Sequence, residues 1–223
     1  MSVKIPVDRA IYGLARHTDS TFENDVRAYE AENAPTGKIV FYGPSYFTRW
    51  REKDYGHRPM AEDLLGASGA KCVINRGFGS SCPEHQLYYY PRLVRPLAPS
   101  VLVYGSWGNW TDFGYSDEEA WELAERVVAW TRTDFPDARV YLVAGCLEKA
   151  PFPYGVHGQF TRFNARMKQY ADTHENVFFL DPKPAFEGTD ESIFADHVHY
   201  NQKGYDIYAD FFRKALAHEL AKF

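Results

Sequence analysis

The sequence predicts an α/β protein built as a three-layer α/β/α sandwich, with about five parallel strands and helices on both faces of the sheet. Two observations lead to this fold class. Short apolar runs of strand length recur along the chain and have the composition of strands buried on both faces. Amphipathic segments alternate with them, and parallel strands need such crossover helices. The predicted strands are Ile39–Tyr42, Lys71–Asn75, Val101–Gly105, Arg139–Ala144 and Asn176–Leu180.

Apolar periodicity predicts the helices that join these strands. A helix beginning after Ser45 would carry Phe47 and Trp50, and another short helix would end near Gly66. The longer predicted helices span about 116–133, 159–174 and 202 to the C-terminus.

The chain is predicted to have one main domain. Residues 1–36 are expected to form an N-terminal extension with a packing helix, in which Phe22, Val26 and Tyr29 share one face. Residues 37–223 are expected to form a single α/β domain, because no Gly/Ser/Pro-rich linker or block of charge divides them.

Composition and charge exclude several classes of partner. The net charge is −5 and both signs are interspersed, so no basic face indicates nucleic acid. No stretch approaches the roughly 20 apolar residues of a membrane span, and the first residues lack the apolar core of a signal peptide. Cys72, Cys82 and Cys146 are an odd set without metal-site spacing, typical of reduced thiols. We therefore expect a cytoplasmic protein without an integral membrane segment; the oligomeric state is open.

Ser45 lies where the first predicted strand ends. Gly43-Pro44 interrupts the apolar run, which places the serine at a strand-to-helix turn. Unpaired backbone N–H groups at the start of a helix could stabilise an oxyanion there, which suits a nucleophile. The same position also suits a helix cap.

Asp196 and His199 are candidates for the groups that would activate such a serine. A histidine can take a serine proton when an aspartate orients the imidazole. An Asp-x-x-His pair can equally be a surface ion pair or a helix cap. Ligands of parallel α/β sheets bind outside the carboxyl ends of the strands, where Ser45, the loop 76–81 and the turn 106–110 all fall.

Taken together, these blocks resemble the SGNH hydrolases, also called GDSL esterases/lipases, over about residues 22–216. Gly-Pro-Ser at 43–45 is similar to the family's Gly-Asp-Ser, and Asn-Arg-Gly-Phe-Gly-Ser at 75–80 to its Asn-x-Gly-x-Gly-Gly. Asp196-x-x-His199 followed by Asn and Gly-Tyr is similar to the final block. The likeness is nearest to the bacterial branch that resembles platelet-activating-factor acetylhydrolase subunits, through Phe-Tyr-Gly-x-Ser and Val-Ile-Asn-Arg-Gly-Phe-Gly.

The resemblance implies a flavodoxin-like fold and an ester hydrolase without metal or cofactor. It assigns Ser45 as nucleophile, His199 as general base and then acid, and Asp196 as its orienter. We expect the substrate to be a small acyl ester, such as an acetylated carbohydrate or a related metabolite, and next a lysophospholipid-like ester or a thioester. The competing interpretation is a binding module that keeps the fold but has lost turnover.

The resemblance also implies an oxyanion hole made by the backbone N–H groups of Ser45 and Ser80 and the side chain of Asn109. Ser80 stands where the family has glycine, and a backbone N–H survives that exchange if serine can adopt the conformation. Asn109 reaches the family's asparagine position only with one inserted residue. Pro44 replaces an Asp or Ser beside the nucleophile.

Aromatic residues in the strand-end loops are candidates for the substrate pocket. Trp107, Trp110 and Tyr154 are expected to bind a small acyl group or a sugar ring, although such residues can also simply pack loops onto the sheet.

Asp196, His197 and His199 lack a further convincing ligand for a metal site. The loop at 77–81 lacks the Gly-Lys-Ser/Thr of a phosphate loop, and no Gly-x-Ser-x-Gly elbow occurs.

Overall fold

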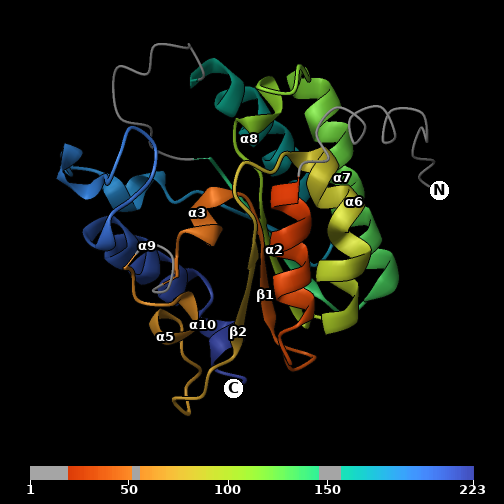
Figure 1. Ribbon diagram of the computed structural model, residues 1–223, viewed down its shortest axis with the longest axis vertical. Coiled ribbons are helices and arrows are strands. Elements are labelled where there is room, and N and C mark those ends of the chain that lie inside the picture. The colour runs from red at the N-terminus through yellow and green to blue at the C-terminus, as the bar shows by residue number, and fades with distance from the viewer. Residues whose placement is uncertain (1–19, 52–55, 146–156) are drawn as a thin grey trace.

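A five-stranded parallel sheet forms the centre of the protein. The structure, a computed structural model, describes residues 20–51, 56–145 and 157–223 (Figure 1). The strand order is β2-β1-β3-β4-β5, the flavodoxin-like order, and every pairing is parallel. This confirms the predicted fold class. The strands are β1 (Ile39–Gly43), β2 (Val73–Gly77), β3 (Val101–Gly105), β4 (Arg139–Val143) and β5 (Val177–Leu180).

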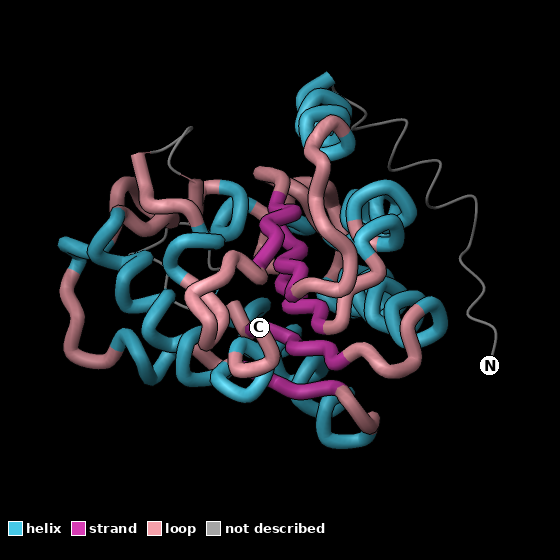
Figure 2. Tube along the Cα trace, turned by 90° about the horizontal axis from the view of Figure 1, so that it is seen from below, coloured by secondary structure: helices cyan, strands magenta, loops and turns pink. Residues whose placement is uncertain are grey.

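Helices cover both faces of the sheet, as Figures 1 and 2 show from the side and from below. Successive residues of a strand point to opposite faces, so Val40 and Tyr42 of β1 join one apolar cluster while Ile39 and Phe41 join the other. The first cluster lies under α2 (Ser20–Glu30), α6 (Pro83–Leu93), α7 (Asp117–Asp134) and α8 (His157–Thr173). The second lies under α3 (Ser45–Thr48), α5 (Met60–Asp63), α9 (Gln202–Ala215) and α10 (Ala217–Leu220).

The observed elements follow the predicted ones closely, with three differences. Strand β2 is displaced by two residues and includes Arg76 and Gly77, which the sequence places in a loop. Helix α6 is not among the predicted elements; it has a proline in its first turn and Pro91 inside it. The C-terminal segment forms two helices separated at Leu216 instead of one. None of the described helices has the length and apolar character needed to cross a membrane.

Helix α2 packs on the first face, beside α6. Its Phe22, Val26 and Tyr29 are buried in the first cluster. Arg92 of α6 forms ion pairs with Glu23 and Glu30 of α2, at 2.9 and 2.7 Å. The packing helix expected within residues 1–36 is therefore present, while the domain boundary at residue 36 stays a prediction.

Glycines end three neighbouring strands, β2, β1 and β3, at the carboxyl edge of the sheet. Gly43 pairs with Gly77 in register, and Gly105 ends β3 beside them. A Cβ atom added to Gly77 would lie 2.5 Å from the backbone nitrogen of Thr48, and one added to Gly43 would lie 2.5 Å from the Gly105 carbonyl oxygen. Only glycine leaves room for these close backbone contacts. Helix α3, which begins at Ser45, therefore packs directly on the strand ends.

Candidate active site

Ser45, His199 and Asp196 form a continuous chain of hydrogen bonds above the carboxyl ends of the strands. His199 Nε2 lies 2.9 Å from Ser45 Oγ, and His199 Nδ1 lies 2.8 Å from Asp196 Oδ2. The serine comes from the start of α3 and the other two from the loop between η4 (Glu191–Ile193) and α9. This arrangement lets the imidazole take the serine proton while the carboxylate holds its Nδ1–H.

The Asp196 carboxylate is held by several donors at once. Oδ1 accepts hydrogen bonds from the backbone N–H groups of Val198 and His199, at 2.8 and 2.7 Å. Arg49 Nη1 donates to Oδ2 at 2.9 Å. Partial burial would raise the pKa of Asp196, but the backbone donors and the His199 side chain outweigh it and hold this pKa well below its ordinary value. Asp196 therefore stays ionised at any pH at which the protein would work.

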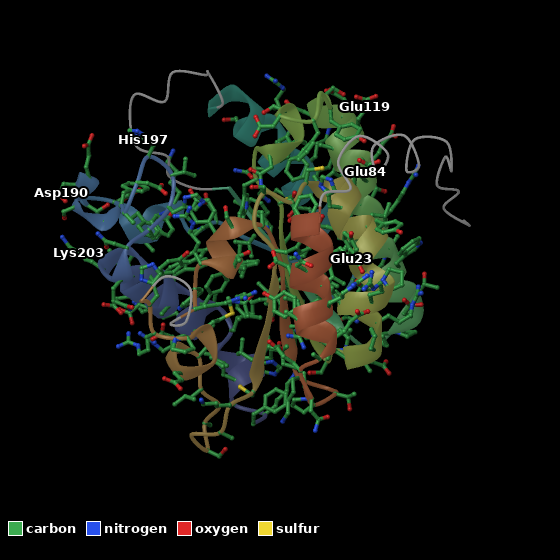
Figure 3. All side chains as sticks on the ribbon, in the orientation of Figure 1. Glu23, Glu84, Glu119, Asp190, His197 and Lys203 are labelled. Carbon is green, nitrogen blue, oxygen red and sulfur yellow. The ribbon has the colours of Figure 1, made fainter. Side chains whose placement is uncertain are left out.

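Burial favours the neutral form of the His199 imidazole. Burial lowers its pKa, its hydrogen bond to Asp196 opposes this, and the positive charge of Arg49 lowers it further. A neutral imidazole is the form that can accept a proton from Ser45. His197, by contrast, is exposed on the same loop (Figure 3).

Neighbouring elements hold both ends of the hydrogen-bonded series Ser45–His199–Asp196. The Asn75 side chain donates to the Phe47 carbonyl at 2.6 Å and accepts from the Gly77 N–H, which ties α3 to the end of β2. Tyr46 OH donates to the Val198 carbonyl at 2.7 Å, and its ring centroid lies 5.9 Å from that of His199. The residue after the serine thus supports the loop that carries the histidine.

Ser80 and Asn109 lie on two loops that contact each other. Ser80 has a φ of 60°, in the left-handed region that favours glycine. Asn109 begins η2 (Asn109–Thr111), directly after Gly108, whose φ is 69°. Asn109 Nδ2 donates to the Ser81 carbonyl at 3.0 Å. The serine therefore keeps a glycine-like backbone, and the asparagine side chain reaches the loop that carries it.

The predicted roles of two aromatic residues in substrate binding are corrected by their burial. Trp110 is 0% exposed, stacks on Phe163, and donates its Nε1–H to Asp117 at 3.2 Å. Trp107 is 5% exposed, and its Nε1–H donates to the Val143 carbonyl at 2.9 Å. Both indoles are therefore core side chains that hold loops onto the sheet. Tyr154 lies outside the described residues.

Arg49 and Tyr46 are site residues that the sequence analysis missed. Both flank the nucleophile position closely in sequence, but the atoms they bind lie in the loop 196–199, about 150 residues away. Nothing in a short motif shows which distant loop a side chain will contact. Proximity to Ser45 is the only signal that could have drawn attention to them.

A parallel α/β sandwich with a serine, a histidine and an aspartate in one hydrogen-bonded chain at its strand ends is typical of serine hydrolases. The profile of the GDSL-like lipase/acylhydrolase family matches residues 41–207, which include all three side chains. The chain therefore belongs to this family, and it is an ester hydrolase. A comparison with curated proteins finds no match.

Solved structures share the fold at low sequence identity. A protein from Streptococcus pneumoniae described as a candidate platelet activating factor has a TM-score of 0.74 at 15% identity, covering 94% of this chain and 99% of that one. A GDSL-like lipase from Bacteroides thetaiotaomicron has a TM-score of 0.69 at 17% identity, with coverage of 89% and 98%. An acetylxylan esterase from Geobacillus stearothermophilus has a TM-score of 0.66 at 16% identity, with coverage of 81% and 94%.

Proposed function

We propose that the protein is a serine esterase that hydrolyses small acyl esters, with acetyl as the preferred acyl group, through an acyl-enzyme intermediate. The observation that carries this proposal is the hydrogen-bonded chain from Ser45 Oγ through the His199 ring to Asp196. Membership of a family of ester hydrolases supports it. The acetylxylan esterase among the structures of similar fold supports an acetylated carbohydrate as the first substrate class to test, with a lysophospholipid-like ester next.

In the proposed mechanism, Ser45 Oγ attacks the ester carbonyl carbon while its proton passes to His199 Nε2. Ionised Asp196 stabilises the imidazolium that results. The tetrahedral intermediate collapses as the imidazolium gives its proton to the leaving alkoxide, which departs as an alcohol. Water then attacks the acyl-enzyme with His199 again as base, and the carboxylic acid leaves as Ser45 regains its proton.

The negative charge on the carbonyl oxygen needs preorganised donors in both steps. The N–H groups of Ser45 and Ser80 and the amide of Asn109 are the proposed donors. Two features support this set: the glycine-like φ of Ser80 and the contact between Asn109 and the loop that carries Ser80. A backbone N–H donates regardless of the side chain attached, so serine in place of glycine is compatible with the role.

The experiment that tests the proposal is hydrolysis of p-nitrophenyl esters from acetate to octanoate, with Ser45→Ala beside the wild type. We expect turnover that is highest for acetate and lost in Ser45→Ala, and fluorophosphonate labelling of wild type that mass spectrometry locates at Ser45. Ser106→Ala is a matched control, because Ser106 also follows a strand end but is 0% exposed. It should keep turnover and labelling.

Three outcomes would count against the proposal. A preference for octanoate would contradict the small acyl group. Labelling or turnover that persists in Ser45→Ala would contradict the nucleophile. Absence of both in the folded wild type would favour a binding module that has lost catalysis.

A further inference from the structure

Three residues with metal-binding side chains meet at the N-terminus of α6, directly after the loop that carries Ser80. Cys82, Glu84 and His85 are buried, with exposed fractions of 0, 2 and 0%. Their ligand atoms, one sulfur, one carboxylate oxygen and one imidazole nitrogen, all lie within 4.8 Å of one another. Glu84 is labelled in Figure 3, near the top of α6. The proposed esterase mechanism uses none of the three.

The Glu84 carboxyl group lacks the partner that a buried acid requires. No charged side chain of the described residues pairs with it, and neither oxygen accepts a hydrogen bond of ordinary geometry. The nearby Tyr115 hydroxyl is a donor, but it carries no charge. A carboxylate without a compensating donor or cation is costly to bury. The group must therefore either hold a proton or face a cation.

The other buried carboxylates of the described residues show how this chain normally meets that requirement. Asp63 accepts from Trp50 Nε1 and pairs with Arg58. Glu219 accepts from Tyr141 OH and pairs with Lys222. Asp117, the remaining one, is paired with an arginine and an indole. Glu84 departs from this pattern, and it is the acid that lies beside a thiol and an imidazole.

The Cys82 thiol and the His85 ring lie side by side, and a bound cation would replace the Cys82 N–H at the lone pair of His85 Nδ1. His85 Nδ1 lies 3.2 Å from Cys82 Sγ and accepts the Cys82 backbone N–H at 3.2 Å. The His85 ring packs against the rings of Phe22 and Phe113, with centroids 4.5 and 4.7 Å away. Sulfur and nitrogen ligands of one tetrahedral Zn²⁺ would be about 3.6 Å apart, from Zn–S and Zn–N bonds of roughly 2.3 and 2.0 Å. Capping of α6 accounts for the contact between the Cys82 thiol and the His85 ring. It does not account for the burial of the Glu84 carboxyl group.

We propose that Cys82, Glu84 and His85 bind one divalent cation of the Zn²⁺ type, which goes beyond the proposed esterase function. One sulfur, one nitrogen and one oxygen ligand suit a borderline cation better than Mg²⁺ or Ca²⁺, which prefer oxygen alone. A thiolate and a carboxylate would neutralise its two charges, so the buried site would carry no net charge. The Cys82 thiol would release its proton to solvent as the sulfur binds the cation.

Such a cation would hold the loop that contains Ser80 and Ser81, because Cys82 follows it directly. Asn109 donates to the Ser81 carbonyl, so it contacts the same loop. Binding should therefore stabilise the fold of this region and raise the melting temperature, whether or not the protein turns over an ester.

The test is titration of the full chain, freed of metal by a chelator and kept anaerobic, with Co²⁺ and then Zn²⁺. We expect one Co²⁺ per chain, a near-ultraviolet charge-transfer band from thiolate to cobalt, and displacement of the cobalt by Zn²⁺. A Cys72→Ser/Cys146→Ser variant should keep the band, because Cys82 is then its only cysteine. Adding Cys82→Ser should abolish the band, and Glu84→Gln in the wild-type background should weaken Co²⁺ binding by more than about tenfold.

The alternative is that Glu84 is simply protonated and that Cys82 and His85 only cap α6. In that case no Co²⁺ binds stoichiometrically to the folded wild type, Glu84→Gln melts at the same or a higher temperature than wild type, and Zn²⁺ shifts neither melting curve. A cobalt band that survives Cys82→Ser would also overturn the proposal. Because these readouts do not involve turnover, they are independent of whether the esterase assignment holds.

Discussion

The candidate active site has two halves that are built in different ways. In the proton-transfer half, side chains do the positioning: Ser45, His199 and Asp196 are linked to one another, and Arg49 and Tyr46 hold the histidine loop. In the proposed oxyanion half, backbone conformation positions the donors. Ser80 and Gly108 both have positive φ, and one amide hydrogen bond from Asn109 links their loops.

This difference explains why the proton-transfer half keeps the residue types of the family motifs while the oxyanion half departs from them. A proton relay needs particular side chains at its atoms, so its residue types cannot change without loss of the chemistry. A donor supplied by a backbone N–H tolerates a change of side chain as long as φ and ψ persist. Ser80 in place of glycine and the altered turn before Asn109 both occur in the backbone half.

The largest effect is expected from Asp196→Asn, in the side-chain half. The amide would lose the negative charge that stabilises the imidazolium and would favour the wrong tautomer of His199. We expect kcat to fall on the order of 10⁴-fold. Steady-state hydrolysis of p-nitrophenyl acetate measures this. Asp190→Asn is the matched control, since Asp190 is exposed and only caps η4 through the Ser192 N–H; an equal loss in both variants would contradict the assigned role of Asp196.

Much of the fold and of the proton-transfer half could be predicted from the sequence. The strands are short apolar runs whose identity does not depend on distant contacts. Helix α6 was missed because its two prolines suggest breaks; Pro83 is tolerated at the first helical position, where no N–H donor is needed. Strand β2 was ended too early because Arg76 is charged and Gly77 is small, yet Arg76 is buried over the Tyr29 ring.

The oxyanion half is tested by Asn109→Ala. If its amide donates to the developing oxyanion, kcat should fall by about 10²–10³-fold while KM changes little. Thr111→Ala is the control, because Thr111 lies in the same turn and bonds the Gly108 carbonyl without reaching the Ser80 loop. A loss of less than about threefold in Asn109→Ala, in a protein that melts normally, would remove Asn109 from the oxyanion hole.

A smaller effect, visible in the pH profile, is expected from Arg49→Met. The Arg49 charge disfavours the imidazolium, so its removal should raise the pKa of His199. As the pH is lowered, the His199 imidazole would then become protonated at a higher pH than in the wild type. The acidic limb of the kcat/KM profile should therefore move to higher pH. Arg51→Met is the control, because Arg51 packs on the Tyr29 ring and donates to Gly77. A limb that stays in place or moves to lower pH would contradict this account.

The smallest effect, on stability, is expected from Ser80→Gly. Glycine adopts a positive φ freely, so the variant should gain roughly 0.5–1 kcal/mol in the free energy of unfolding and keep full activity. Ser81→Gly should do the opposite, since Ser81 has no positive φ and its hydroxyl accepts from Gln86. Urea denaturation compares the two. Destabilisation by Ser80→Gly would mean that the serine side chain, and not the backbone, holds this loop.

The remaining errors arise where tertiary contacts decide the role of a residue. Trp107 and Trp110 lie in strand-end loops, as predicted, but acceptors inside the protein satisfy their N–H groups. No local pattern shows whether an indole N–H will find such an acceptor. Likewise, Cys82, Glu84 and His85 do not have a recognised metal spacing, and only their common burial at one helix end draws attention to them.

The glycines that end β1, β2 and β3 have a consequence for how this enzyme could change over time. A Cβ atom added to Gly43 or Gly77 would lie 2.5 Å from a backbone atom, of Gly105 in the first case and of Thr48 in α3 in the second. We therefore expect substitution there to displace Ser45 relative to His199. New substrates should therefore be acquired through changes in the surrounding loops, and libraries for directed evolution should leave these strand ends untouched.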